Sequence, residues 1–298
     1  MSERPPVGPP RGLLPGAAPP PEGEHRRVAP PPALAPYVAH FWWVSWDLSS
    51  PRVVETLPHP TVHVVFEAPD HRATLTPVSL RRFTRTLEGR GRVFGVKLRP
   101  AVFGALSRVQ VASLRERSVG VGEVLAAPLV DALRALGDDL RAITVAEDAV
   151  RAAEARLVGL SWPVLPSALT DVRDLVERLE HGREIVRVED AARMASLDAR
   201  TLERRFRAWV GLTPKSVLAR YRLIEAAERV QHEADTPLVA VAAAVGYSDQ
   251  AHFSREFRAV VGRTPRQLRD DARALHAAGS GEEGATRGSV SSRRPRRS

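Results

Sequence analysis

The chain has no cysteine, no long apolar run and only two lysines, Lys97 and Lys215. The lack of cysteine excludes disulfide scaffolds, thiolate zinc sites and cysteine nucleophiles. No apolar run approaches the roughly 18 residues that a membrane span requires, and the N-terminus lacks the compact hydrophobic stretch of a secretory leader. We therefore expect a cytoplasmic protein with no membrane partner.

The composition is that of a soluble globular protein. Of the 298 residues, 43% are hydrophobic and 27% are charged, which allows one large domain or two ordinary ones. The net charge is +9, and most of the positive excess lies in the C-terminal part. Such an excess suits a polyanionic partner. A coding bias towards arginine produces the same excess of positive charge, so the net charge alone does not decide whether the chain binds nucleic acid.

Two patterns divide the N-terminal half. Residues 1–33 carry prolines spaced too closely for a helix or a sheet ladder, so we expect a disordered lead-in. Residues 34–158 contain short apolar runs that predict strands over 38–46, 52–57, 62–67, 73–79 and 93–98, then helices over 101–106, 129–136 and 145–157. Thr144 is expected to cap the last helix, with Glu147 as its capping-box partner. The pattern predicts a small β-rich domain, a barrel or a sandwich, with helices attached.

The C-terminal half is helical. Residues 159–168 contain Trp162, Pro163 and Pro166 and are expected to be a linker. Helices are expected over 170–180, 188–195, 199–210, 214–233, 237–245 and 250–261, with a short one after Pro265. Residues 279–298 have no apolar face and are expected to be a disordered basic tail. The expected fold class is α+β, with an all-α domain at residues 169–272.

An internal duplication lies within the helical part. At an offset of 51 residues Asp198 falls on Asp249, and eight of the 13 positions from Leu202 to Pro214 are identical in the second copy. In each copy an Asp stands at the N-cap of a helix with an apolar stripe. The stripes are formed by Leu202, Phe206 and Val210 in the first copy and by Phe253, Phe257 and Val261 in the second. A short alanine-rich helix precedes each, so each copy is predicted to be a helix-turn-helix.

The ends of the two units set the distance between them. Gly211 and Gly262 are expected to end their helices in the left-handed conformation, and the Thr-Pro pair that follows suits the start of the next helix. Residues 214–233 then link the units as one helix. A helix of 20 residues measures about 30 Å, close to the roughly 34 Å after which the major groove recurs on one face of B-DNA. This spacing predicts a reader of two successive major-groove segments.

The second unit resembles a known family. The stretch Ala242-Ala-Ala-Val-Gly-Tyr-Ser-Asp-Gln-Ala-His-Phe-Ser-Arg-Glu-Phe-Arg258, with Gly262-Arg-Thr-Pro-Arg-Gln-Leu-Arg269 after it, is similar to the most recognisable part of AraC/XylS-type transcriptional regulators. The resemblance covers residues 170–270 and implies a DNA-binding domain. It also implies which side chains meet base edges: Arg200, Glu203 and Arg204 in the first helix, and Gln250, His252 and Arg255 in the second. The first unit departs from the family pattern, because Ser196-Leu197 replaces the expected glycine before the cap.

The chemistry of these positions agrees with base reading. Arg204 and Arg255 can each fork onto guanine O6 and N7, and Gln250 can pair with adenine N6 and N7. Glu203 can accept from cytosine N4. Phosphate contacts, which give affinity without sequence choice, are expected from Arg207, Lys215, Arg258, Arg263 and Arg266. The alternative is that these side chains form ion pairs with acidic neighbours on a solvent-exposed face and contact no DNA.

The resemblance is weaker before residue 159. Regulators of this type usually carry a sensing or dimerising domain there, and residues 34–158 are expected to be an uncharacterised version. Aromatic residues on the early strands fit either ordinary core or an apolar ligand pocket lined by Phe41, Trp43, Trp46 and Phe66. His59 and His63 share a strand face but lack convergent further ligands, so neither a metal site nor a cofactor is expected. The helix over 145–157 fits packing within its domain or a homodimer contact.

The sequence therefore predicts a transcriptional regulator, not an enzyme, that binds double-stranded DNA at specific sites. An unknown small-molecule effector, RNA polymerase and a second copy of the chain are further candidate partners. Two alternatives stay open: an enzymatic N-terminal domain that the C-terminal half brings to DNA, and a helix-turn-helix interaction protein without DNA binding. No paired carboxylates or activated nucleophile favour the first, and salt-dependent DNA binding would argue against the second.

Overall fold

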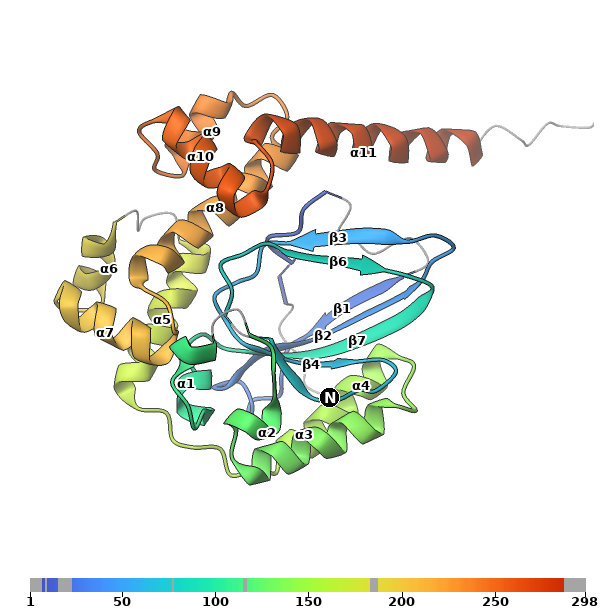
Figure 1. Cartoon of the computed structure of the whole chain (residues 1–298), viewed down its shortest axis with the longest axis vertical. Coiled ribbons are helices and arrows are strands. Elements are labelled where there is room, and N and C mark those ends of the chain that lie inside the picture. Colours follow the sequence, from blue (N-terminus) through green and yellow to red (C-terminus); the bar gives the residue numbers. More distant parts are fainter. Residues whose placement is uncertain are drawn as a thin grey trace, which may run out of the picture.

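The chain folds as a β-rich part followed by a helical part (Figure 1). The computed structural model describes residues 7–8, 10–15, 23–76, 78–114, 117–182 and 187–286. We call the part from residue 23 to residue 157 the β domain, and the part from residue 167 to residue 286 the helical domain. This arrangement confirms the α+β fold class.

The β domain contains a six-stranded antiparallel sheet and a separate two-stranded ribbon. The order in the sheet is β1 (Glu24–Val28), β2 (Val38–Asp47), β7 (Arg90–Leu98), β4 (His63–Glu67), β5 (Thr74–Thr76) and β8 (Val119–Gly120). The ribbon pairs β3 (Arg52–Thr56) with β6 (Phe83–Leu87). The described strands do not close into a barrel. The barrel, one of the two shapes that the sequence predicted, is therefore excluded.

One face of the sheet carries the apolar core. Alternate residues of a strand point to the same side, and here Phe41, Phe94 and Phe66 of three adjacent strands lie with ring centroids 6.0 and 6.2 Å apart. The helices α3 (Ala127–Leu140) and α4 (Ala146–Leu157) lie beneath this face (Figure 1). A Cβ at Gly137 of α3 would lie 2.4 Å from the His71 carbonyl, so glycine permits the close approach of helix and sheet.

The opposite face of the sheet is polar and aromatic. His40, Lys97 and His63 lie directly opposite one another on β2, β7 and β4. Beside this row the Trp42 indole covers Gly95, where an added Cβ would come within 2.0 Å of the ring. Trp42 Nε1 donates to His63 Nδ1 at 3.1 Å. The row lies at the end of the sheet that meets the helical domain.

The helical domain has two short helix pairs at the ends of one long helix. Its elements are α5 (Ser167–His181), α6 (Val188–Met194), α7 (Ala199–Trp209), α8 (Pro214–His232), α9 (Leu238–Ala244), α10 (Gln250–Val261) and α11 (Pro265–Thr286). The last two residues of the expected linker, 167–168, begin α5, whereas residues 158–166 contain no helix or strand. They are nevertheless held, because Trp162 stacks on Tyr37 with centroids 4.6 Å apart. Among the described residues no helix is both long and apolar enough to cross a membrane.

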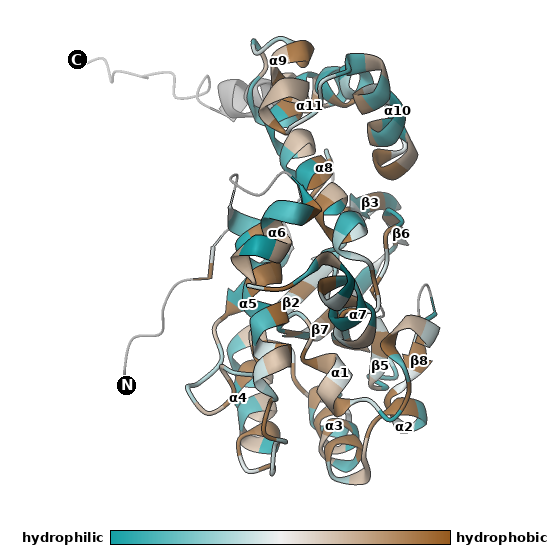
Figure 2. Cartoon of the chain, turned by 90° about the vertical axis from the view of Figure 1, so that its left-hand side faces the viewer, coloured by the Kyte–Doolittle hydropathy of each residue, from teal (hydrophilic) through white to brown (hydrophobic). Residues whose placement is uncertain are grey.

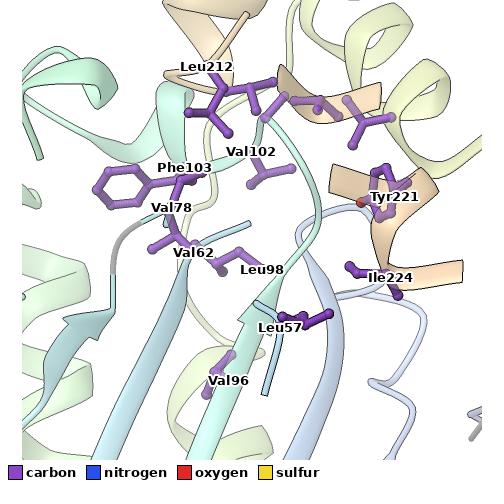
Figure 3. Close-up of a cluster of buried hydrophobic side chains, with 14 of the residues drawn as sticks. Leu57, Val62, Val78, Val96, Leu98, Val102, Phe103, Leu212, Tyr221 and Ile224 are labelled. Carbon is purple, nitrogen blue, oxygen red and sulfur yellow. The ribbon is translucent and has the colours of Figure 1, made fainter. Parts of the chain in front are cut away.

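The two domains share one hydrophobic core. Leu57 and Leu98 of the β domain belong to the same buried cluster as Leu212, Tyr221 and Ile224 of the helical domain (Figure 3). The contact continues at α1 (Phe103–Leu106), where a Cβ at Gly104 would lie 2.9 Å from the Trp209 ring. The helical domain is therefore docked on the β domain and not merely tethered to it.

The prediction that residues 1–33 form a disordered lead-in is wrong for those of them that the structure describes. Glu24–Val28 form β1, which pairs with β2. Leu14 is 2% exposed, and its amide donates to the Glu55 carbonyl at 3.1 Å. A proline prevents the hydrogen bonding of a sheet only at its own position, and residues 22–29 contain no proline. Residues 1–6, 9 and 16–22 lie outside the described part.

Three other local expectations are corrected. Helix α4 starts after Val145, which has no side-chain cap, so Thr144 and Glu147 do not form a capping box; Glu147 instead lies in the first turn, where its charge suits the helix dipole. Helix α11 continues to Thr286, so the tail is helical over 279–286. Residues 287–298 lie outside the described part. Strands β6 and β8 were not expected, since β8 has only two residues and the middle of β6 consists of the polar residues Thr84, Arg85 and Thr86.

Candidate nucleic-acid interface

The helices α7 and α10 begin at the aspartates expected as caps. Asp198 accepts a hydrogen bond from Thr201 N at 2.9 Å, and Asp249 accepts from Ala251 N and His252 N at 2.8 and 3.2 Å. These backbone amides lower the pKa of both aspartates, because the bonds favour the charged carboxylate. The caps fix where each helix begins and which side chains lie on its first turn.

The inward faces of both helices are buried as predicted. Phe206 and Phe257 are each 0% exposed, and the Phe253 and Phe257 rings meet edge to face with centroids 5.4 Å apart. Replacing one such ring by alanine in a tightly packed interior lowers the free energy of unfolding by about 3–5 kcal/mol. This packing orients each helix about its own axis.

The chain leaves each unit in the way that the sequence indicated. Gly211 and Gly262 have φ angles of +79° and +81°, the left-handed conformation that glycine adopts without strain. Thr213 then caps α8 by accepting from Ser216 N at 3.2 Å, with Pro214 in the first turn. Helix α8 has 19 residues, which corresponds to about 28 Å.

All six side chains expected at base edges are exposed. They are Arg200, Glu203 and Arg204 on α7 and Gln250, His252 and Arg255 on α10. Figure 2 shows both helices coloured mostly hydrophilic, near the two ends of α8. The β domain covers the far end of α7, near Trp209, and leaves the first two turns open. All six side chains are therefore accessible to solvent, although Glu203 pairs with Arg207 and His252 with Glu256 on the same helices.

The five expected phosphate contacts differ in their surroundings. Lys215, Arg258 and Arg266 are exposed, whereas Arg207 forms an ion pair with Glu203 on the same helix at 2.7 Å. Such an exposed pair contributes only about 0.3–0.5 kcal/mol, so a phosphate can replace the carboxylate at little cost. Arg205, by contrast, pairs with Asp171 of α5 at 3.2 Å and braces α7 against its neighbour.

Arg263 is the exception among the phosphate positions. Its guanidinium contacts Glu55 of strand β3 and also pairs with Asp271 at 2.7 Å. Glu55 is only 8% exposed and also pairs with Arg82 at 2.7 Å. The second helix-turn-helix unit is thus joined to the ribbon of the β domain by charged contacts that the sequence did not reveal.

A group of contacts around Tyr247 was also missed by the sequence reasoning. Tyr247 lies in the turn between α9 and α10, is 6% exposed and donates a hydrogen bond to Glu256 of α10 at 2.6 Å. Arg222 of α8 lies over its ring, 4.2 Å from the centroid. The offset of 51 residues carried a signal for this group, since Asp171 and Arg205 of the first unit fall on Arg222 and Glu256.

A buried polar cluster lies where α5 and α8 meet the β domain. Glu180 of α5 is 3.0 Å from His59 Nδ1 and 3.9 Å from the Lys97 ammonium, and Tyr221 donates to it at 3.4 Å. Burial alone would raise the pKa of Glu180, but the hydrogen bond with His59 and the Lys97 charge outweigh it and lower that pKa. Burial lowers the pKa of Lys97, with Glu180 opposing the shift. A charged pair thus joins the two domains inside the protein.

The histidines near this cluster favour their neutral forms. Burial and the Lys97 charge lower the pKa of His63 to about 3, and burial also lowers the pKa of His40, His59 and His71. His63 lies on β4, whereas His59 precedes that strand, so the two do not share a strand face. Within the described residues, histidine and acidic side chains form no group of three that could hold a metal ion.

The aromatic residues considered for a ligand pocket lie in the interior. Phe41, Trp43 and Phe66 belong to the main core and are at most 2% exposed, and Trp46 packs with Leu87 and Val93 in a smaller cluster. A cavity of about 400 Å³ lies elsewhere, between α5, α8 and α9, and its lining includes Glu180, Tyr221 and Glu228. The apolar stripe of α4 is buried within the β domain, where α4 packs on α3.

The helical domain contains two capped helix-turn-helix units joined by one long helix, the arrangement that the resemblance to AraC-type regulators implies. Residues 191–271 match a family model described as a helix-turn-helix domain, and residues 26–120 match a domain of unknown function, DUF6597. The C-terminal part of the chain is accordingly similar to a helix-turn-helix domain. The β domain carries the match of unknown function.

Relatives of known description match the same C-terminal part. The HTH-type transcriptional activator RhaS of Pectobacterium carotovorum is 42% identical over 77 residues, which cover 26% of this chain and 27% of that protein. RhaS of Escherichia fergusonii is 38% identical over 103 residues, which cover 34% and 37%. The match thus spans about a third of these relatives or less. The DNA-binding domain of AdpA, solved with a target DNA, is 30% identical with a TM-score of 0.33, over 36% of this chain and 96% of that domain.

Proposed function

We propose that this chain is a transcriptional regulator that binds duplex DNA at specific sites through two successive major-groove segments. The observation that carries the proposal is the exposure of all six expected base-reading side chains on two capped helices, while the apolar stripes of the same helices are buried. The description of the RhaS relatives as transcriptional activators supports it. Reading of chromosomal DNA implies a cytoplasmic location.

The roles proposed for the residues follow from their chemistry and position. Arg204, Arg255 and Gln250 meet purine edges, and Glu203 meets a cytosine amino group. Arg200 and His252 lie on the first turns of the same helices and complete the two reading surfaces. Phosphate contacts come from Arg207, Lys215, Arg258, Arg263 and Arg266. Arg207 and Arg263 exchange their carboxylate partners for phosphate when DNA binds.

A salt titration of the full chain tests DNA binding. We expect the logarithm of the association constant to fall linearly with the logarithm of salt concentration, with a slope of about −4 to −5 for five phosphate contacts. The probe is a duplex selected by the chain from a random library, compared with an unrelated duplex of equal length. A flat dependence, or selection of no preferred sequence, would instead favour an interaction module that no longer binds DNA.

Two neighbouring arginines of α10 provide a matched pair of variants. Arg255→Ala is expected to cost about 1–3 kcal/mol on the selected site and to relax one base position. Arg258→Ala is expected to weaken the selected and the unrelated duplex alike and to reduce the salt slope by about 1. Competition binding with single-base variants of the site measures both effects. Equal losses on both duplexes for both variants would contradict the assigned roles.

We also propose that the β domain modulates DNA binding in response to a small molecule or a partner. The support is its contact with both units, at Trp209 of the first through Gly104 and at Arg263 of the second through Glu55. A homodimer and a contact with RNA polymerase belong to the same proposal. The length and symmetry of the selected site report the number of chains bound.

A further inference from the structure

The side chain of Tyr247 connects three helices of the second unit. It is 6% exposed, and its ring lies under the Arg222 guanidinium of α8 at 4.2 Å and beside Phe253 of α10 at 5.2 Å. Arg222 is itself fixed, because its Nε donates to the carbonyl of Val245, the residue that ends α9. The tyrosine ring therefore has a single position defined from two sides.

The hydroxyl of Tyr247 transmits this position to the recognition helix. It donates to Glu256 Oε2 at 2.6 Å. Burial and the Glu256 carboxylate raise the pKa of Tyr247 well above its ordinary value, so the hydroxyl keeps its proton over the working pH range. A hydrogen bond to a charged acceptor is stronger than a neutral one. Glu256 is thereby held although almost half of its side chain is exposed.

Glu256 in turn contacts His252, one of the six expected base-reading residues. Its Oε1 lies 3.5 Å from His252 Nε2, one helical turn away, and the Tyr247 and His252 rings meet edge to face with centroids 5.6 Å apart. The imidazole is 53% exposed, so solvent and DNA can reach it. On a helix surface an exposed pair of this kind is weak alone. Here the buried tyrosine orients one of its members.

The first unit has a simpler brace at the equivalent positions. At the offset of 51 residues, Asp171 and Arg205 correspond to Arg222 and Glu256, with the charges exchanged. In the first unit the two side chains pair directly at 3.2 Å. In the second unit Tyr247 stands between them, and its counterpart in the first unit is Ser196. The position of His252 corresponds to Thr201, so the link to a reading residue exists in the second unit alone.

We propose that Tyr247 is a positioning residue for sequence recognition: its hydroxyl holds Glu256, and together they fix the His252 imidazole in the orientation in which it meets a base edge. The proposal rests on the proposed function. A side chain that is ordered before binding loses less conformational freedom in the complex, and its hydrogen bond discriminates more sharply between bases. Loss of the tyrosine hydroxyl should therefore reduce selectivity at one base position.

The test uses the full chain with Tyr247→Phe, His252→Ala and the double variant. Tyr247→Phe keeps the ring and its packing and removes only the hydroxyl. The probes are the duplex that the unaltered chain selects from a random library, its single-base variants and an unrelated duplex. We expect Tyr247→Phe to reduce the preference at one base position by about 3- to 10-fold, the value of one net hydrogen bond. The double variant should lose no more than His252→Ala alone, because both act through one contact.

Two further variants separate positioning from folding. Glu256→Ala changes an exposed side chain and should reproduce the loss at the same base position. Tyr37→Phe removes a hydroxyl of the β domain that donates to the Pro163 carbonyl of the linker, and it should leave every base preference unchanged. The affinity for the unrelated duplex should not change in the Tyr247→Phe variant, and the loss of one hydrogen bond should lower the melting temperature by a few degrees at most.

The outcomes distinguish this inference from the function on which it rests. Selection of no sequence by the unaltered chain would refute the proposed function. A selected site whose base preferences survive Tyr247→Phe would refute the positioning role alone. Additive losses in the double variant, or equal losses on selected and unrelated duplexes, would also overturn it, because they indicate a general structural effect.

Discussion

Phe257→Ala is expected to lower the free energy of unfolding by about 3–5 kcal/mol, one of the two largest effects that we predict. Phe257 is 0% exposed, packs edge to face on Phe253 and is the middle residue of the apolar stripe of α10. Its removal leaves a cavity that the capped helix and its tight turns cannot close. Urea unfolding of the full chain, followed by circular dichroism, measures the loss.

The matched control for this variant is Phe83→Ala. Phe83 lies on strand β6 and is 44% exposed, so the same substitution removes much less buried surface. We expect a loss below about 1 kcal/mol there. Similar losses for the two variants would contradict the view that the Phe257 stripe holds the second unit together. DNA affinity should fall with Phe257→Ala and remain with Phe83→Ala.

Glu180→Leu is expected to destabilise the chain by about 3–5 kcal/mol, because it leaves the Lys97 ammonium buried without its carboxylate. Lys97 is 7% exposed and lies between His40 and His63 on the sheet. A histidine is either neutral or positively charged, so these two side chains cannot supply the negative charge that Lys97 loses. The same unfolding measurement reports the effect.

A second substitution tests this explanation of the Glu180 effect. In the double variant Glu180→Leu, Lys97→Met no buried charge is left alone, so most of the stability should return, since apolar replacements of a buried pair are often neutral or stabilising. A double variant as unstable as the sum of its single variants would contradict the pairing. The effect also has a pH signature. The lowered pKa of Glu180 means that its stabilisation is complete above the ordinary glutamate value of 4.5 and is lost as the pH falls through the folded-state pKa.

These two predictions concern different parts of the proposed regulator. The Phe257 stripe keeps one reading helix in place. The Glu180–Lys97 pair joins α5 to the β domain, next to the shared core at Leu57 and Ile224. Tyr221 of α8 also contacts Glu180, so the cluster joins α5, α8 and the β domain.

Much of the helical domain followed from the sequence because its determinants are local. The caps Asp198 and Asp249 act within three residues of the helix start. The left-handed glycines end their helices by their own backbone freedom. The apolar stripes repeat with the period of one helix, and the 51-residue offset doubled each of these signals. The same local rules gave the exposure of the six expected base-reading positions.

The β domain was predicted less completely, because strand pairing joins residues far apart in the sequence. Strands were expected near β2, β3, β4, β5 and β7, but β1 lies in a gap between prolines and β6 pairs only with β3. Their short segments carry little apolar alternation, so no window of the sequence distinguishes them from loops. The sequence favoured ordinary core for the aromatic cluster over a ligand pocket, and the packing around Phe41, Trp43 and Phe66 placed these rings in the interior.

The sequence by itself determined the duplicated helix-turn-helix, its caps and ends, and the side chains on its outer faces, since each depends on residues within a few turns of one helix. The tertiary structure alone decided which charges meet: Arg263 with Glu55, Glu180 with Lys97, and Tyr247 with Glu256. Partners of this kind lie on separate elements and become neighbours only when those elements pack. The strength of a charge pair depends on the distance between the charges and on their burial, and neither follows from spacing along the chain.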